Sequence, residues 1–146
     1  MSIRPPIVAL AYLVMAWALD YGLRPPRLVP PPWDDVGLVL LGAGATLVVW
    51  PIVLFQRAGT SHDPAERPTA LVESGPYRLT RNPMYLGVSA ILLGIGLLVG
   101  TIPFLLVPAV FLLTMNLTWV PREERALEEE IGEPYRVYRG RVRRWI

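Results

Sequence analysis

The chain has 146 residues, of which 53% are hydrophobic and 18% are charged, and its formal net charge is +2. Soluble domains usually carry about 25% charged residues, so this composition disfavours a soluble protein. Cysteine is absent and His62 is the only histidine, which excludes a disulfide framework and a cysteine nucleophile and disfavours a zinc site or a Ser-His-Asp triad; we expect no bound metal.

The first half of the chain predicts two membrane spans. Residues 5–23 begin with two prolines, which suit a helix start, and they lack a small-residue cleavage site, so we expect this segment to be retained. The proline-rich segment 24–35 cannot continue a helix and predicts an extended loop. Residues 36–56 carry no charge and are long enough to cross a bilayer core of about 30 Å.

The second half predicts a helical hairpin. Residues 82–121 carry no charge, and as one helix they would extend roughly 60 Å, enough for two crossings. Gly100 and Pro103 provide a break near the middle. The length leaves room for one domain, so we expect a single all-α integral membrane domain over residues 1–146, with about four transmembrane helices at residues 5–23, 36–56, 83–99 and 103–121.

Arginine placement predicts the orientation. With four spans, both chain ends and the loop at 57–82 share one side of the membrane, and all 14 arginines except Arg24 and Arg27 lie on that side. The positive-inside rule then places the loop 57–82 and the helical tail 122–146 in the cytosol. The chain is rich in arginine, alanine and proline and lacks lysine, so we expect a bacterial inner membrane protein. The arginine placement predicts that both of its termini are cytosolic.

Polar residues should cluster where the third predicted span begins and the fourth ends, because these two spans form a hairpin. The cluster would contain Asn82, Tyr85, Arg122, Glu123 and Glu124. Ionisable groups at a membrane edge are costly unless they are paired or hydrated, so this cluster is a candidate functional site. Such groups collect at the edges of the spans rather than deep within them, which disfavours a channel or transporter.

The same residue types also have structural explanations. Arginines flank spans under the orientation rule, aromatic residues anchor spans at the lipid interface, and glutamates favour the first turn of a helix. Arg78, Arg81 and Arg122 could be such flanking arginines. Tyr77, Tyr85 and Trp119 could be such interfacial anchors. Glu123 and Glu124 could occupy such a first helical turn. Small residues would permit close helix packing within one chain or between copies, at Gly42, Thr46, Gly87, Gly94 and Gly96.

Two motifs flank the predicted hairpin. The first reads Gly75-Pro76-Tyr77, four residues, then Asn82-Pro83-Met84-Tyr85-x-Gly87. The second reads Glu123-Glu124-x-x-Leu127, then Gly132-x-x-Tyr135-x-x-Tyr138 and an Arg-Val-Arg-Arg-Trp ending. In this order and spacing they resemble the isoprenylcysteine carboxyl methyltransferase family, which is related to the phospholipid methyltransferases. The resemblance covers residues 55–146 and implies an S-adenosylmethionine-dependent methyltransferase.

This resemblance implies a cofactor site on the cytosolic side. Carried over by position, the cofactor contacts would be Thr69, Ala70, Leu71, Val72, Tyr77, Asn82, Pro83, Met84, Tyr85 and Glu123. The family commonly has a histidine where this chain has Asn82, and an asparagine can form hydrogen bonds but cannot titrate. An arginine that the family uses for the acceptor falls on Trp119 here, and Arg122 is its nearest substitute.

The predicted chemistry assigns two catalytic residues. The methyl donor is already activated, so the protein mainly aligns the reactants, and Glu123 suits the donor's ammonium group. A carboxylate acceptor needs a cation, for which Arg122 is available, and an amine acceptor needs a base, for which Glu124 is available.

The expected partners are the lipid bilayer and a lipophilic methyl acceptor, with no nucleic acid. A prenylcysteine carboxylate is one candidate acceptor, and a phospholipid amine or a small apolar nucleophile is the alternative. A non-enzymatic membrane binding protein that keeps the same scaffold is the remaining possibility. The sequence does not decide the oligomeric state.

Overall fold

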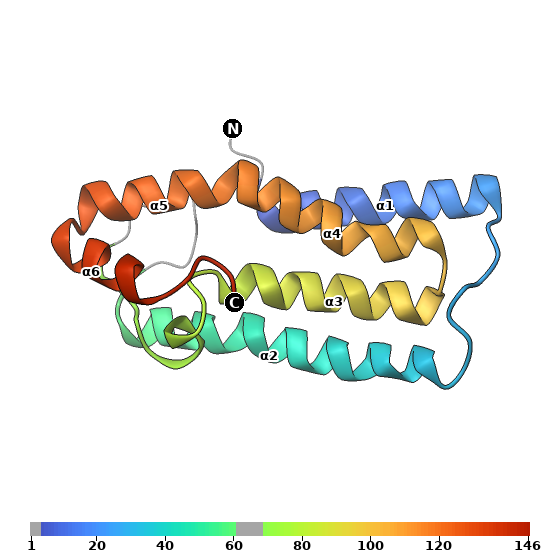
Figure 1. Ribbon diagram of the computed structural model, residues 1–146, viewed down its shortest axis with the longest axis horizontal. Helices are drawn as coiled ribbons and strands as arrows, with labels where there is room; N and C mark the ends of the chain where they lie inside the picture. The colour runs from blue at the N-terminus through green and yellow to red at the C-terminus, as the bar shows by residue number, and fades with distance from the viewer. Residues whose placement is uncertain (1–3, 61–68) are drawn as a thin grey trace.

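The computed structural model describes residues 4–60 and 69–146, so His62 lies outside the described residues. This part of the chain is helical, with loops between the helices (Figure 1). Two short 3-10 helices are η1 (Trp33–Asp35) and η2 (Gly75–Arg78). The α-helices are α1 (Pro5–Leu23), α2 (Val36–Arg57), α3 (Pro83–Val99), α4 (Ile102–Leu117), α5 (Trp119–Glu130) and α6 (Glu133–Arg141).

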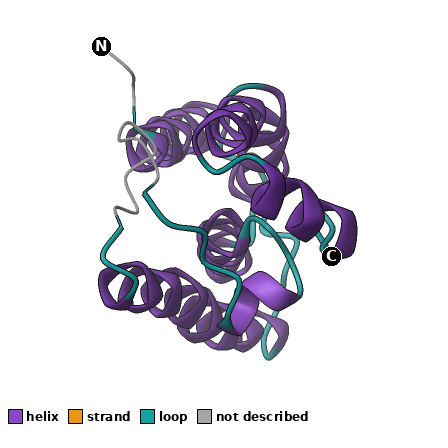
Figure 2. Cartoon of the chain, turned by 90° about the vertical axis from the view of Figure 1, so that its left-hand side faces the viewer, coloured by secondary structure: helices purple, strands orange, loops and turns teal. Residues whose placement is uncertain are grey.

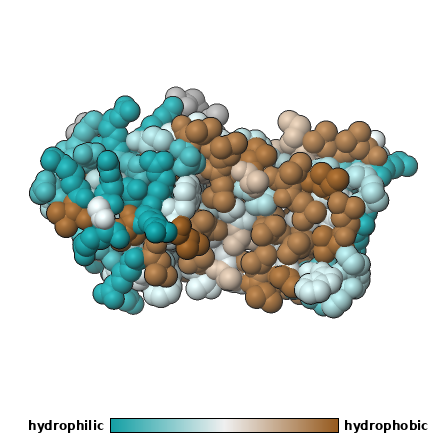
Figure 3. Space-filling model, viewed as in Figure 1, coloured by the Kyte–Doolittle hydropathy of each residue, from teal (hydrophilic) through white to brown (hydrophobic). Residues whose placement is uncertain are grey.

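The chain is an all-α integral membrane protein, as its sequence predicts. Among the described residues, three helical segments are long and apolar enough to cross a membrane, namely Pro5–Leu23, Trp33–Arg57 and Ile102–Glu130, and α3 is a shorter apolar helix. The surface shows the same division, because hydrophobic residues cover the bundle and hydrophilic residues gather at the end that holds α5 and α6 (Figure 3). The helices begin and end close to the predicted span limits, and their passage across the bilayer as four separate spans stays a prediction.

The first four helices alternate in direction along the long axis (Figure 1). In the end-on view α3 lies between α2 and the α1–α4 pair, and α1 packs mainly on α4 (Figure 2). Tyr12 of α1 and Thr114 of α4 share a hydrogen bond of 2.8 Å between their hydroxyl groups. Because α1 is covered on one side only, its outer face presents apolar side chains such as Leu10 and Trp17 to the surroundings, as expected of a helix that contacts lipid.

Two glycine pairs bring α2 and α3 into backbone contact. A Cβ atom placed on Gly44 would lie 2.6 Å from the carbonyl oxygen of Gly87, and one on Gly37 would lie 2.5 Å from that of Gly94. Side chains do not fit at such distances, so the helices approach as closely as small residues allow. The structure therefore confirms Gly87 and Gly94 as close packing positions, whereas Gly42 faces open space.

We expect Gly44→Ala to lower the free energy of unfolding by about 1–3 kcal/mol, because the new methyl group meets backbone rather than a movable side chain. Gly42→Ala is the matched control on the same helix, since its methyl group meets nothing within 4 Å and alanine favours the helix. Unfolding of both variants in detergent micelles, followed by circular dichroism, checks this difference. Equal stability of the two variants would contradict the described α2–α3 interface.

α5 extends α4 toward the charged end of the molecule (Figure 1). The helix is interrupted at Thr118, whose hydroxyl donates a 2.6 Å hydrogen bond to the carbonyl oxygen of Thr114, and Pro121 cannot donate the next helical hydrogen bond. α5 and α6 then pack with η2 around a second core that includes Tyr77, Tyr135 and Tyr138. This core fixes η2 and the start of α3 beside α5.

Candidate functional site

Tyr85 and Glu123 meet at the junction of α3 and α5. The Tyr85 hydroxyl donates a hydrogen bond to Oε1 of Glu123. The Tyr85 ring is 8% exposed and packs against Phe111 of α4, with 6.4 Å between ring centroids. Burial of Tyr85 disfavours the explanation that it anchors the chain at the lipid surface. The hairpin thus brings together two residues that are far apart in sequence, as the predicted hairpin of the third and fourth spans implies.

Tyr77 of η2 lies close enough to Glu123 to respond to its charge. Burial raises the pKa of the Tyr77 hydroxyl, and the charge of Glu123 contributes to the same shift. The hydroxyl therefore remains protonated at neutral pH and can donate a hydrogen bond. The Tyr138 hydroxyl fixes the backbone here, because it donates to the carbonyl oxygen of Tyr77 over 2.7 Å. We refer to Tyr77, Tyr85 and Glu123 together as the carboxylate cluster.

Asn82 precedes α3 and binds the C-terminal tail, residues 142–146. Its side-chain amide donates to the carbonyl oxygen of Arg144 over 2.9 Å, and the Thr80 hydroxyl donates to the same oxygen over 3.0 Å. The backbone N–H of Arg81 donates to the carbonyl oxygen of Arg143 over 3.0 Å. The first motif and the end of the chain therefore form one folded unit next to the carboxylate cluster.

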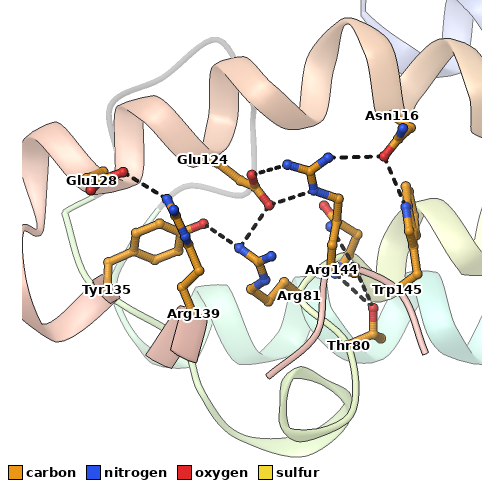
Figure 4. A network of polar contacts seen from close by, with 10 residues as sticks. Thr80, Arg81, Asn116, Glu124, Glu128, Tyr135, Arg139, Arg144 and Trp145 are labelled. Atoms are coloured by element: carbon orange, nitrogen blue, oxygen red, sulfur yellow. Dashed lines mark hydrogen bonds and ion pairs between the residues drawn. The ribbon is translucent and has the colours of Figure 1, made fainter. Parts of the chain in front are cut away.

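Glu124 holds two arginines at the centre of a polar network (Figure 4). One carboxylate oxygen lies 2.9 Å from Nη1 of Arg81, and the other lies 2.6 Å from Nη2 of Arg144. The side chains of Glu124 and Arg81 are only 13% and 12% exposed. The hydrogen bond and charge of Glu124 raise the pKa of the Arg144 guanidinium. This carboxylate joins the loop before α3, α5 and the C-terminal tail.

The network extends to α4 through Asn116 (Figure 4). The side-chain oxygen of Asn116 accepts hydrogen bonds from Nη1 of Arg144 over 3.2 Å and from the indole of Trp145 over 3.1 Å. At the other end, Arg81 donates to the Tyr135 hydroxyl over 3.2 Å. Sequence reasoning assigned none of these five residues to the site. The Arg-Val-Arg-Arg-Trp ending was the available signal for Arg144 and Trp145.

The other predicted site residues lie in different surroundings. Arg122 of α5 is exposed and makes no hydrogen bond or ion pair within residues 4–60 and 69–146. Pro83 is buried and Met84 is half-buried at the start of α3. Thr69 donates its backbone N–H to the Thr60 hydroxyl over 3.1 Å. Ala70 is half-buried, and Leu71 and Val72 line a cleft between α2 and α6.

The structure therefore gathers Tyr77, Asn82, Tyr85, Glu123 and Glu124 at the α3–α5 junction. It leaves the guanidinium of Arg122 without contacts to them among the described residues. In chemical terms the junction offers a half-buried carboxylate that accepts a hydrogen bond from the Tyr85 hydroxyl, with Tyr77 near enough to respond to its charge. Such a site suits a cationic ligand group, because a charge-assisted hydrogen bond is roughly twice as strong as a neutral one.

Comparison with known proteins assigns the family. A family model described as phospholipid methyltransferase matches residues 34–133, a stretch that contains α2 to α5. An uncharacterized protein of Haemophilus influenzae is 40% identical over 63 residues, which are 43% of this chain and 100% of that protein. No solved structure matches significantly. The matched family is one of methyltransferases, related to the isoprenylcysteine carboxyl methyltransferases that the motifs resemble. The chain belongs to the phospholipid methyltransferase family.

Proposed function

We propose that the protein transfers a methyl group from S-adenosylmethionine to a lipophilic acceptor at the membrane surface. Membership of a methyltransferase family supports the reaction class. The single observation that carries the cofactor assignment is the carboxylate cluster at the α3–α5 junction. A half-buried carboxylate with tyrosine hydroxyls beside it matches the ammonium group of this donor.

The proposed roles of the residues follow from their contacts. Glu123 binds the ammonium group, and Tyr85 orients the Glu123 carboxylate through its hydrogen bond. Tyr77 remains a protonated donor facing the same charge. Asn82, which is bonded to the C-terminal tail, keeps the first motif in place. We propose the remaining motif positions as walls of the cofactor site: Thr69, Ala70, Leu71, Val72, Pro83 and Met84.

Bound S-adenosylmethionine would supply a methyl group that is already activated, so the chain's task is to align the acceptor and exclude water. The apolar helices α1 to α4 suit an acceptor that is dissolved in lipid. The site lies at the bundle end that carries most of the arginines, whereas Arg27, which donates to the carbonyl oxygen of Leu98 over 3.1 Å, lies at the α3–α4 turn. We therefore propose that the site and both termini face the cytosol of a bacterial inner membrane.

Two acceptors are consistent with these residues. The family description favours a phospholipid amine, and the motif resemblance favours a prenylcysteine carboxylate, for which Arg122 supplies a nearby exposed cation. Both carboxylate oxygens of Glu124 are engaged by the guanidinium groups of Arg81 and Arg144, which favours an acceptor that needs no base from the protein. The role of Glu124 as a base stays a prediction.

An isotope transfer assay tests this function. Purified protein in liposomes is supplied with S-adenosylmethionine carrying a tritiated methyl group, together with farnesylcysteine or phosphatidylethanolamine. We expect label in the organic phase with one of these acceptors, and mild alkali should release it from a methyl ester but not from a methylated amine. Saturable cofactor binding without label on either acceptor would contradict the enzyme assignment and favour a non-enzymatic binding protein.

A further inference from the structure

An open cleft of about 860 Å³ lies between the end of α2, η2 and the end of α6. Neither Tyr85 nor Glu123 lines it. Tyr138 does line it, and the Tyr138 hydroxyl is bonded to the backbone of Tyr77. Leu71 and Val72, which we propose as walls of the cofactor site, also line this cleft. The cleft is therefore a neighbour of the proposed cofactor site, and it differs from that site in making no contact with Tyr85 or Glu123.

The cleft carries an excess of positive charge. Arg57 from the last turn of α2, Arg78 from η2 and Arg141 from α6 all line it, with Glu73 as its one lining carboxylate among the described residues. Arg141 pairs with Glu73 over 2.6 Å. Arg57 and Arg78 make no ion pair or hydrogen bond within residues 4–60 and 69–146. Two guanidinium groups that have no partner among the described residues, one from α2 and one from η2, therefore line the same cleft.

The cleft has both apolar and charged walls, because Leu54 and Val72 line it together with Arg57, Arg78 and Arg141. Trp50 of α2 lies beside η2, because a Cβ atom on Gly75 would be 3.1 Å from the Trp50 indole nitrogen. Trp50 is 49% exposed, and tryptophan is enriched at the membrane–water interface. Leu54 and Leu71 give the cleft apolar walls on this side. A ligand in this cleft would have one part in contact with lipid and another part in contact with water.

We propose that this cleft binds the phosphate of an anionic phospholipid headgroup, with Arg57 and Arg78 as its ligands. Guanidinium groups form strong paired hydrogen bonds with phosphate oxygens, and basic pockets on the cytosolic side of membrane proteins hold anionic headgroups. The apolar walls at Leu54 and Leu71 suit the glycerol and the first acyl carbons. This lipid is not the methyl acceptor, and its binding does not depend on the proposed methyl transfer.

Titration of the purified protein in detergent micelles tests the proposal. Binding of short-chain phosphatidylglycerol, short-chain phosphatidylcholine and glycerol 3-phosphate is measured by thermophoresis. We expect saturable binding of phosphatidylglycerol only. Arg57→Gln and Arg78→Gln should each weaken that binding about fivefold, the effect of one basic residue near an anionic lipid surface. Arg125→Gln is the matched control, because Arg125 is exposed on α5 and does not line the cleft.

Several outcomes would overturn the proposal. Absence of phosphatidylglycerol binding, or equal affinity for phosphatidylcholine, would show that the cleft does not select an anionic headgroup. Equally tight binding of glycerol 3-phosphate would assign the cleft to a soluble phosphate ester instead of a lipid. If Arg125→Gln lost as much affinity as Arg78→Gln, the binding would depend on the total positive charge of the protein and not on the cleft. Unchanged melting temperatures establish that each variant is folded.

Discussion

Replacing Glu123 by glutamine is expected to weaken S-adenosylmethionine binding by about 10- to 100-fold, the value of a hydrogen bond to a charged group. The glutamine keeps the size of the side chain and can still accept a hydrogen bond from Tyr85. It removes the negative charge that we assign to the ammonium group of the donor. The protein should remain folded and inserted, since the ion pairs of Arg81 and Arg144 involve the neighbouring Glu124.

Equilibrium dialysis with radiolabelled S-adenosylmethionine measures this loss. Glu128→Gln is the matched control on the same helix, because Glu128 is 41% exposed and pairs with Arg139 and Arg136 over 3.0 and 3.7 Å. Exposed pairs of this kind contribute about 0–1 kcal/mol, so the control should bind the cofactor normally. Near-native affinity in Glu123→Gln, or an equal loss in Glu128→Gln, would show that Glu123 does not hold the cofactor.

Glu124→Gln is expected to lower the free energy of unfolding by about 3–5 kcal/mol, the usual cost of removing one partner of a buried ion pair. Without the carboxylate, Arg81 is left almost buried with an uncompensated charge beside Arg144. The tail residues 142–146 would also lose their strongest link to α5. Glu128→Gln again provides the comparison, with an expected change below about 1 kcal/mol.

Chemical unfolding in micelles, together with the methyl transfer assay, separates a structural role of Glu124 from a catalytic one. If the role of Glu124 is structural, Glu124→Gln should lose stability, and methyl transfer should fall for a carboxylate acceptor and for an amine acceptor alike. The double variant Glu124→Gln with Arg144→Gln should be less unstable than the sum of the single variants, because the two residues interact directly. Native stability with transfer lost only for an amine acceptor would instead identify Glu124 as the base.

The helices and the α3–α5 junction could be predicted because each depends on local signals. Long uncharged runs define helices in a membrane, and Gly100, which adopts φ 78°, ends α3 where the hairpin was expected. Once α3 and α4 form a hairpin, the segments before one and after the other must meet. The pairing of Tyr85 with Glu123 follows from that topology and from the motifs.

The polar network and the α2 partners of Gly87 and Gly94 could not be predicted, because they depend on how distant segments dock. Arg81 had a sufficient explanation as a positive flank, and nothing in the spacing of Arg144 indicated that the tail folds back onto Glu124. The sequence gives no reason to prefer Gly44 over Gly42 as a packing position. Gly44 contacts α3 because it lies on the face of α2 that packs against α3, whereas Gly42 does not.

Calorimetric titration of the purified, detergent-solubilised protein with S-adenosylmethionine and with its demethylated product is the most direct test of the central claim. We predict saturable binding of both, since both carry the ammonium group assigned to Glu123. Absence of binding by either compound, from protein that melts cooperatively, would contradict the methyltransferase assignment.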